Sequence, residues 1–413
     1  MIKVSDFTRH VATLAGGTAI AQAINLLMAP VLTRLYGPDA FGDFALFMSV
    51  VSAVAIVVTL RYEMAVMLPD EDRSAAKLVW ICIWLSVFTG LVLTLVLLIL
   101  HQINQDWLWG GVTWLLPLIV LMLGITQTLN NWYSRRKEYR RPGMSRIGQS
   151  SFNAATSWTA AVKGFMGKGL FLGAFAGQTF SAFWLLVKFL RQKWAKPNRT
   201  EVRELLKKYV AFPTSNVPFA IVGMLQVNAI VFILAYLFDK TVVGYFSRTL
   251  LVLQAPMWLM GSAVAQVFYQ QASVLSGDRK ALARLTVSIA KKSALVALPV
   301  YALIAIAGPE LFAFVFGAAW EESGWYAAIL APYMYFDFIR LGLSNLPLVM
   351  DKQKALFART ALGVVILAAA LFLGEHFSGI VRTSFALMSV LLSLYNLYMT
   401  FWLIRLPRKD ETT

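Results

Sequence analysis

The amino-acid sequence predicts an all-α integral membrane protein with twelve transmembrane helices in two six-helix lobes. Two observations predict this class: 59% of the 413 residues are hydrophobic while only 14% are charged, and apolar windows recur along the whole chain. One soluble core cannot bury so much apolar surface. A membrane helix needs about 20 mostly apolar residues. Such windows lie near residues 11–33, 40–68, 77–100, 111–133, 145–163, 169–190, 209–237, 241–269, 286–307, 324–350, 354–374 and 379–404.

The distribution of basic residues predicts the orientation of these windows. The formal net charge is +16, and most Lys and Arg residues lie at the termini and in alternate loops. The intervening loops contain only Arg34, Lys163, Lys168, Lys240 and Arg382. This alternation follows the positive-inside rule, so both termini are expected in the cytoplasm. It also argues against nucleic acid as a partner, whereas anionic membrane lipid could be attracted to the basic loops.

A long polar stretch at residues 188–208 separates six windows from six. We therefore predict an N-terminal six-helix lobe at residues 1–190, a cytoplasmic basic linker at 191–208 and a C-terminal six-helix lobe at 209–413. Paired bundles of this kind commonly bind a substrate between lobes and rock to alternate access. Transport is the function that this organisation favours.

The two halves share a short sequence match at the turn between their first two windows. Shifting the first half by 202 residues aligns LYGPDAFGDFALF (35–47) with LFDKTVVGYFSRT (237–249). The matched pairs are Leu35 with Leu237, Gly42 with Gly244, and Phe44 with Phe246. Because six is an even number, both halves enter the membrane in the same sense. The match therefore predicts a parallel repeat related by a pseudo-twofold axis along the membrane normal.

Residues that carry catalytic or metal chemistry are scarce in this sequence. Cys82 stands alone, and His10, His101 and His376 fall near predicted helix ends without forming a ligand set. No P-loop or serine-centred elbow is present, and the acidic run PDED (69–72) is expected to be a solvated loop. We expect a protein that is not an enzyme and that uses neither a metal nor another cofactor.

Several ionisable side chains lie inside the apolar windows. Asp337 and Arg340 are deep in the tenth window, and their i, i+3 spacing places them on one helical face where they can pair. Arg248 lies in the eighth window, and Arg61 lies near the inner end of the second. Glu63 follows Arg61 by two positions, and we therefore expect it to face another way.

These charges predict a binding site for an anionic head group. Ionisable groups at membrane depth are costly and usually face a bundle interior or a wet cavity. Arginine keeps its charge and presents a planar fork that suits phosphate oxygens. The predicted substrate-binding residues are Arg61, Arg248, Arg340, Gln22, Asn25, Gln226, Asn228 and Gln254. The residues predicted for ion coupling or charge pairing are Asp337, Glu63 and Asp43.

Each of these predictions has a structural alternative. Arg61, Glu63 and Arg248 could extend to the lipid head groups. Asp337 and Arg340 could merely neutralise each other, and interhelical hydrogen bonding explains the amide side chains equally well. Arg34 is expected to anchor its helix at the membrane surface.

Glycine and proline positions predict how individual helices pack and bend. Gly169, Gly173 and Gly177 form a ladder with four-residue spacing in the sixth window, which favours close approach of a neighbouring helix. The seventh and eighth windows are interrupted by proline, which predicts kinks there. The prolines concerned are Pro213, Pro218 and Pro256.

Three stretches of this sequence resemble the Wzx-type polysaccharide-biosynthesis flippases of bacteria. The first is LTRLYGPDAFGDFALF (32–47), which continues to LRYEMAVMLPDED (60–72). The others are NNWYSRRKEYRRPGMSRIGQS (130–150) and VVGYFSRTLLVLQAPMWLMGSAVAQVFYQQAS (242–273). The spacing of the windows is also similar to that family throughout the chain.

The resemblance implies a member of the superfamily that also contains multidrug extruders. It implies that the chain moves an undecaprenyl-pyrophosphate-linked repeat unit of O-antigen, capsule or exopolysaccharide from the inner to the outer leaflet of the bacterial inner membrane. The implied partners are that polyprenyl-linked glycan, membrane lipid, a coupling proton or sodium ion, and the polysaccharide polymerase machinery. The family's charged cavity residues are not mapped onto this chain, so the predicted site rests on depth and charge alone.

Other functions remain open at the level of sequence. A drug or organic-cation exporter of the same superfamily would be expected to carry acidic residues in its spans, and the first window has none. A membrane polymerase or glycosyltransferase would need a substantial catalytic region outside the membrane. A membrane scaffold without transport activity is a further alternative.

Overall fold

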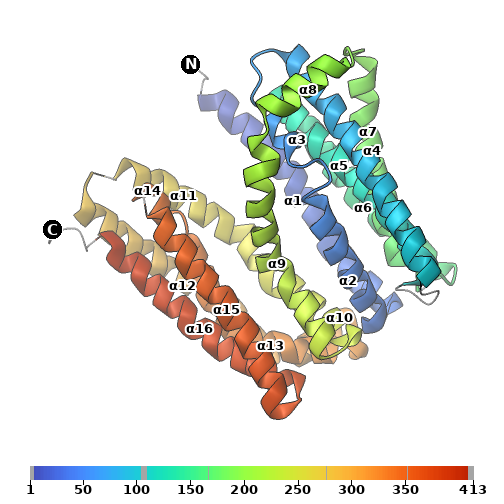
Figure 1. The fold of residues 1–413 in the computed structure, drawn as a ribbon. Coiled ribbons are helices and arrows are strands. Elements are labelled where there is room, and N and C mark those ends of the chain that lie inside the picture. The colour runs from blue at the N-terminus through green and yellow to red at the C-terminus, as the bar shows by residue number, and fades with distance from the viewer. Residues whose placement is uncertain (1–3, 104–108, 166, 276, 351, 408–413) are drawn as a thin grey trace. The chain divides into compact units, whose positions relative to one another are not determined.

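The computed structural model describes residues 4–103, 109–165, 167–275, 277–350 and 352–407. In these ranges the chain is helical, with helices joined by short turns and no strand (Figure 1). Helix is the expected state, because a backbone in lipid must satisfy its own hydrogen bonds. The chain forms two compact units, Met1–Ala229 and Ile230–Thr413. The all-α prediction is confirmed for the described residues.

The first unit is built around α5, which packs against α2, α4 and α7. A second contact surface joins α6 to α1 and α7. The elements of this unit are α1 (Val4–Leu35), α2 (Pro38–Ala55), α3 (Tyr62–Ala65), α4 (Asp72–Ile103), η1 (Gly110–Trp114), α5 (Leu115–Arg135), α6 (Arg140–Val162), α7 (Gly169–Arg191), α8 (Arg199–Lys208), η2 (Phe212–Asn216) and the first part of α9 (Val217–Leu237).

The second unit is built around α13, which packs against α10, α12 and α16. Helix α15 lies against α16. The elements of this unit are the last part of α9, then α10 (Lys240–Pro256), η3 (Met257–Gly261), α11 (Ser262–Val274), α12 (Arg279–Phe316), η4 (Ala318–Trp320), α13 (Glu321–Gly342), α14 (Leu346–Val349), α15 (Gln353–Ser378) and α16 (Val381–Arg405).

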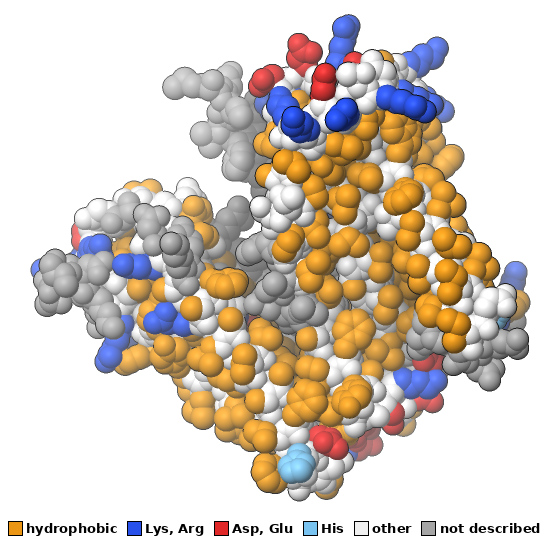
Figure 2. All heavy atoms as spheres, viewed as in Figure 1, with side chains coloured by type: hydrophobic (Ala, Val, Ile, Leu, Met, Phe, Trp, Pro, Cys, Tyr) orange, Lys and Arg blue, Asp and Glu red, His pale blue; other side chains and the backbone are white. Residues whose placement is uncertain are grey.

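Eight described helical segments are long and apolar enough to cross a membrane. Their outer faces also suit lipid: on α4, for example, Leu91 is 64% exposed although it is fully apolar. Figure 2 shows Lys and Arg gathered at the end of the first unit where α8 lies, next to a surface of hydrophobic side chains. These features identify a multi-pass membrane protein.

The turn that matches between the two halves of the sequence has the same form in both. Helix α1 ends at Leu35 and α9 ends at Leu237, while α2 begins at Pro38 and α10 at Lys240. Both pairs of positions differ by the shift of 202 residues that aligns the two sequences. Within each unit the helices also pack in a common order, since α5 packs on α4 and α7 just as α13 packs on α12 and α16. The matched stretches therefore lie at equivalent turns between two helices, whereas the parallel repeat of the two halves stays a prediction.

The glycine ladder on α7 forms the predicted close contact, and its neighbour is α6. A Cβ atom built on Gly173 would lie 2.7 Å from the backbone oxygen of Asn153, and one on Gly177 would lie 2.5 Å from that of Gln149. At Gly169 the same atom would collide with the hydroxyl of Tyr36. Only glycine permits α6 to approach so closely, and the prediction is confirmed.

The basic linker folds mainly as part of the first unit. Residues 199–208 form α8, whose capping box joins Asn198 and Glu201. The Nζ atom of Lys77 in α4 lies 2.5 Å from Oε1 of Glu201 and holds α8 against the helices. The boundary between the two compact units lies further along the chain, between Ala229 and Ile230 in α9. The division at 190 and 209 stays a prediction based on sequence.

The predicted kinks coincide with changes of helix type. Pro213 lies in the π-helical turn η2, and Pro256 immediately precedes the π-helical turn η3. Pro218 lies in the first turn of α9, where proline is tolerated. Proline lacks the amide hydrogen of a regular α-helical bond, so the neighbouring carbonyls adopt a wider turn.

Candidate functional site

The predicted site residues belong to both compact units. In the first unit they lie on α1, α2, α3, α9 and the turn after α2, and in the second on α10 and α13. Among these predicted residues, Arg61 pairs with Glu63 in the first unit, and Asp337 pairs with Arg340 in the second.

The second apolar window does not form one continuous helix. Helix α2 ends at Ala55, and residues 56–61 form turns that lead to the short helix α3. Leu60 and Arg61 adopt left-handed backbone conformations, with φ angles of 50° and 64°. Such angles are costly for residues with a Cβ atom and stop a right-handed helix. The predicted window 40–68 is therefore interrupted close to its predicted charges.

The break in the helix brings Arg61 and Glu63 together. The Nη1 atom of Arg61 lies 3.6 Å from Oε1 of Glu63. The expectation that these side chains face different ways is wrong, because it assumed a continuous helix between them. The Nε atom of Arg61 is buried and has no hydrogen-bond partner among the described residues. A buried donor without a partner is costly. Anion binding by Arg61 stays a prediction.

Glu63 is held in place by neighbours from three segments. Its side chain is only 5% exposed, and Thr59 donates a hydrogen bond to its Oε2 atom. Asn131 of α5 donates from Nδ2 to the Glu63 carbonyl over 2.9 Å. Thr89 of α4 donates to the carbonyl of Val58 over 3.1 Å. These bonds attach the irregular segment to α4 and α5, so the Arg61 guanidinium is presented from a fixed backbone.

The Asp337 and Arg340 side chains form the pair expected from their spacing. Arg340 donates to Oδ1 of Asp337 from Nε over 2.9 Å and from Nη2 over 2.6 Å. Both bonds reach the same oxygen, and Oδ2 of Asp337 accepts no hydrogen bond from the described residues. The second carboxylate oxygen is therefore available to a proton or a cation.

Three tyrosines from three helices interact electrostatically with Asp337. They are Tyr301 of α12, Tyr333 of α13 and Tyr395 of α16. The Tyr301 hydroxyl donates to the carbonyl of Leu253 over 2.9 Å, and the Tyr395 hydroxyl donates to that of Arg359 over 3.1 Å. These two hydrogen bonds fix the Tyr301 and Tyr395 rings against neighbouring helices.

The remaining predicted residues do not join either ion pair in the contacts of the described residues. Gln22 is partly buried and Asn25 exposed on α1, while Asp43 is partly buried on α2. Arg248 and Gln254 are partly buried on α10. Asn228 donates to the carbonyl of Met224 in its own helix over 3.4 Å. Gln226 lies in α9, and its side chain is outside the described part of the structure.

Two arginines that the sequence analysis did not single out lie within helices. Arg146 follows the start of α6 by almost two turns and donates to the Thr18 hydroxyl of α1. Arg359 lies in α15 with its Cζ atom 4.4 Å from the centroid of the Trp402 ring, and its Nε atom is buried without a hydrogen-bond partner among the described residues. Their positions near the starts of predicted windows made them resemble loop residues.

A chain of uncharged side chains also crosses the first unit. Gln149 of α6 donates to Gln178 of α7 over 2.8 Å, and Gln178 donates to Thr126 of α5 over 3.0 Å. Gln178 is only 4% exposed. Such bonds between helices stabilise packing in lipid, so we assign this chain a structural role. In the described residues no group of three His, Cys, Asp or Glu side chains could hold a metal ion.

Comparison with known families identifies the chain. Residues 31–324 match the family model described as polysaccharide biosynthesis protein. This match covers residues 31–229 of the first unit and residues 230–324 of the second. The chain belongs to the polysaccharide biosynthesis protein family. No curated protein sequence gives a significant match.

Solved structures show which fold this polysaccharide biosynthesis protein has. An inward-facing multidrug resistance MATE family transporter of the MOP superfamily superimposes with a TM-score of 0.71 at 14% identity, covering 95% of this chain and 96% of that one. A MOP superfamily transporter from Pyrococcus furiosus is described as having a binding pocket of reverse polarity. It superimposes with a TM-score of 0.58 at 14% identity, covering 97% of this chain and 96% of that one. A variant of a Vibrio cholerae MATE transporter superimposes with a TM-score of 0.56 at 13% identity, covering 98% of this chain and 97% of that one. The chain has the MATE fold, and together with the family match this confirms the resemblance drawn from its sequence.

Proposed function

We propose that this protein is a flippase for a lipid-linked oligosaccharide. In this proposal, twelve transmembrane helices in two six-helix lobes, related by a parallel pseudo-twofold repeat, alternate access across the bacterial inner membrane with both termini in the cytoplasm. The cargo is an undecaprenyl-pyrophosphate-linked repeat unit, which passes from the inner to the outer leaflet. The match of residues 31–324 to the polysaccharide biosynthesis family carries the proposal.

The chemistry of the buried charges supports a phosphate-bearing cargo. A pyrophosphate is anionic, and Arg61 has a buried Nε donor that binds no described residue. Arg340 uses Nε and Nη2 on Asp337, and we assign its remaining nitrogen to a second acceptor. Arg248 lies about two turns into α10 and is a third cationic side chain within a helix. Planar guanidinium groups suit phosphate oxygens, whereas the polyprenyl tail can remain in lipid.

Asp337 is the residue that we assign to energy coupling. Its Oδ2 atom accepts no hydrogen bond from the described residues, so a proton or sodium ion can bind there and weaken the pair with Arg340. Releasing Arg340 would then change how strongly the lobe holds an anion. The membrane potential could assist, since it contributes about 2.3 kcal/mol per charge per 100 mV.

Export of an organic cation is the second candidate function. The structural similarity to a multidrug MATE transporter favours it at the level of fold. Against it, arginines are prominent among the charges inside the helices, and the Pyrococcus furiosus relative is described as having reverse pocket polarity and a different function. Arg61 and Arg340 are each paired with one carboxylate, so a cation cargo would have to displace an arginine from Glu63 or Asp337 before it could bind there.

Deletion of the gene distinguishes the two candidates. Loss of a flippase should leave complete lipid-linked repeat units on the inner leaflet and abolish surface polymer. Complementation with wild type should restore the polymer, whereas Arg248→Ala or Arg340→Ala should restore little of it despite normal membrane insertion. Unchanged surface polysaccharide together with increased drug sensitivity would show that the protein exports drugs instead.

A further inference from the structure

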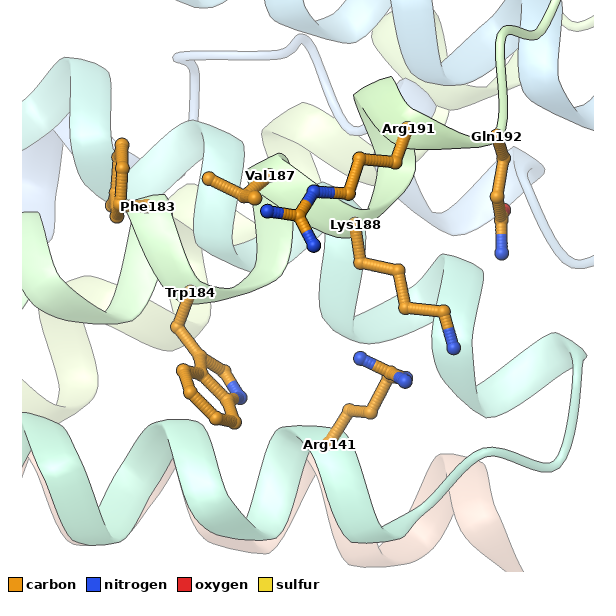
Figure 3. Close-up of a pocket in the computed structure, with 7 residues that line it drawn as sticks. All are labelled: Arg141, Phe183, Trp184, Val187, Lys188, Arg191 and Gln192. Atoms are coloured by element: carbon orange, nitrogen blue, oxygen red, sulfur yellow. The ribbon is translucent and has the colours of Figure 1, made fainter.

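A groove lies between α6 and α7 at the end of the first unit where α7 terminates. It has a volume of about 540 Å³ and is lined by Arg141 of α6 and by Phe183, Trp184, Lys188 and Arg191 of α7. Figure 3 shows that the Arg141, Lys188 and Arg191 side chains extend into the space between the two helices. The groove therefore combines three cations with an aromatic wall.

The charge in the groove is not neutralised by the protein. Glu138 lies beside it, with Oε2 placed 2.6 Å from Nε of Arg141 and 3.5 Å from Nζ of Lys188. Burial raises the pKa of Glu138, but the hydrogen bond from Arg141 and the nearby cations outweigh it and lower that pKa. Arg191 has no ion-pair partner among the described residues and is exposed. Glu138 is also shared with Arg136, whose Nε atom lies 3.6 Å from its Oε1 atom, so this one carboxylate does not neutralise the groove cations and a positive excess remains.

An aromatic track leads away from these cations along α6 and α7. The Trp184 ring stacks on Phe180 with centroids 6.0 Å apart, and Phe180 stacks on Phe152 of α6 at 4.5 Å. Phe152 is 48% exposed, so the track faces outward. Gly148 makes room for the Phe180 ring, because a Cβ atom at this position would collide with it. The track is therefore built into the packing of α6 and α7.

The length of the track matches one membrane leaflet. Lys188 and Phe180 are separated along α7 by roughly 12 Å at a rise of 1.5 Å per residue. The hydrocarbon of one leaflet is about 15 Å thick, half of the full core. A phosphate held by the cations would place an acyl chain along the aromatic rings as far as the bilayer centre.

We propose that this groove binds one anionic glycerophospholipid of the surrounding membrane. Its phosphate interacts with Arg141, Lys188 and Arg191, and one acyl chain lies against Trp184, Phe180 and Phe152. A free phosphate ion would use the cations but not the exposed aromatic wall. Basic pockets between helices on the cytoplasmic side are suited to acidic head groups, and the basic loops assign this end to that side. The lipid is a bound partner here and not the cargo.

Native mass spectrometry of the full-length protein tests this proposal. The protein is exchanged into micelles containing equal amounts of phosphatidylglycerol and phosphatidylcholine, and retained lipid is counted per molecule. Wild type should retain one phosphatidylglycerol in preference to phosphatidylcholine. The double variant Lys188→Gln/Arg191→Gln should lower that retention about thirtyfold, as expected when two basic side chains that contribute about 1 kcal/mol each are removed.

A matched control removes two cations elsewhere on the same end of the unit. Arg203 and Lys207 are exposed on α8, outside the groove. The double variant Arg203→Gln/Lys207→Gln should retain phosphatidylglycerol like wild type. Trp184→Ala, which leaves every charge in place, should also reduce retention. Equal losses in the two charge variants, or no lipid preference in wild type, would overturn the proposal.

Competition identifies the source of the bound phosphate. Millimolar inorganic phosphate should not displace phosphatidylglycerol if the acyl chain contributes to binding. Undecaprenyl pyrophosphate at equal concentration should also leave it in place. Displacement by inorganic phosphate would show a simple anion site, and preferential displacement by undecaprenyl pyrophosphate would show a cargo-loading site; either result overturns the proposal. Because no step measures transport, these outcomes do not depend on the proposed flippase activity.

Discussion

The guanidinium of Arg61 lies 3.6 Å from the carboxylate of Glu63, although only one residue separates them in the chain. On a regular helix, side chains two positions apart point in different directions. The left-handed conformations of Leu60 and Arg61 remove that restriction. Strained backbone conformations often occur at functional sites, and this one, which lies next to the buried carboxylate of Glu63, leads to the first prediction.

Replacing Arg61 should reduce polysaccharide export in proportion to the loss of anion binding. Arg61→Ala removes the charge and the buried Nε donor, and we expect most export to be lost. Arg61→Lys keeps the charge but not the planar fork, so it should restore export only in part. Surface polymer in complemented deletion cells is the measurement, with membrane abundance checked by immunoblotting. Full export by Arg61→Ala would leave this arginine with a purely structural role.

The Asp337 and Arg340 pair can be tested for function beyond mutual neutralisation. Asp337→Asn leaves Arg340 without its partner, and because both side chains are only partly buried we expect a loss of about 1–3 kcal/mol of stability. The double variant Asp337→Asn/Arg340→Gln removes both charges and should regain much of that stability. We nevertheless expect it not to export.

A matched pair of charges provides the control for this experiment. Arg382 and Glu322 form an ion pair between α16 and α13 away from the other site. Arg382→Gln/Glu322→Gln should retain both thermal stability and export. If the Asp337/Arg340 double variant exports as well as this control, the inner pair serves only to neutralise itself.

The close contact of α6 and α7 should tolerate no added methyl group at Gly173. Its Cβ atom would lie 2.7 Å from the backbone oxygen of Asn153, and backbone cannot easily move within two packed helices. Overpacking of this kind costs about 1–3 kcal/mol. Gly173→Ala should therefore lower the temperature of unfolding in detergent. Gly16→Ala is the control, since no atom lies within 4 Å of the new Cβ and the substitution favours helix. If Gly173→Ala left the temperature of unfolding unchanged, the tight contact between α6 and α7 would be refuted.

The Glu138 cluster predicts a pH-dependent contribution to stability. The net effect of burial and the neighbouring cations is a lowered pKa for Glu138 in the folded protein. The ionised Glu138 side chain therefore stabilises the folded protein fully above the ordinary carboxyl pKa of about 4.3. This stabilisation is lost as the pH falls through the lower pKa that Glu138 has in the folded protein. Glu138→Gln should cost about 1 kcal/mol at pH 7, and the difference from wild type should shrink towards zero in acid.

An exposed acid on α8 gives the comparison for this pH experiment. Glu204 is exposed. Glu204→Gln should match wild type in thermal unfolding at both pH 7 and pH 3.5. A Glu138→Gln deficit that persisted unchanged at the lower pH would point to packing of the side chain and not to its charge.

The sequence by itself determined the fold class, the repeated turn and the glycine contact. Apolar content and window length leave helix as the way to satisfy the backbone in lipid. The match of Leu35 with Leu237 located the ends of α1 and α9, because turn positions depend on local residues such as Gly37 and Asp239. The spacing of Asp337 and Arg340 indicated their pairing, since i, i+3 neighbours meet on any regular helix.

Only the tertiary structure decided where that regularity fails. A backbone break at Leu60 and Arg61 has no glycine or proline signal, because bonds from Thr89 and Asn131 on other helices hold the segment. The same holds for the groove: Arg141 and Lys188 are far apart in sequence, and they converge because the glycines of α7 let α6 lie against it. Periodicity describes one helix at a time, whereas a site depends on which helices meet.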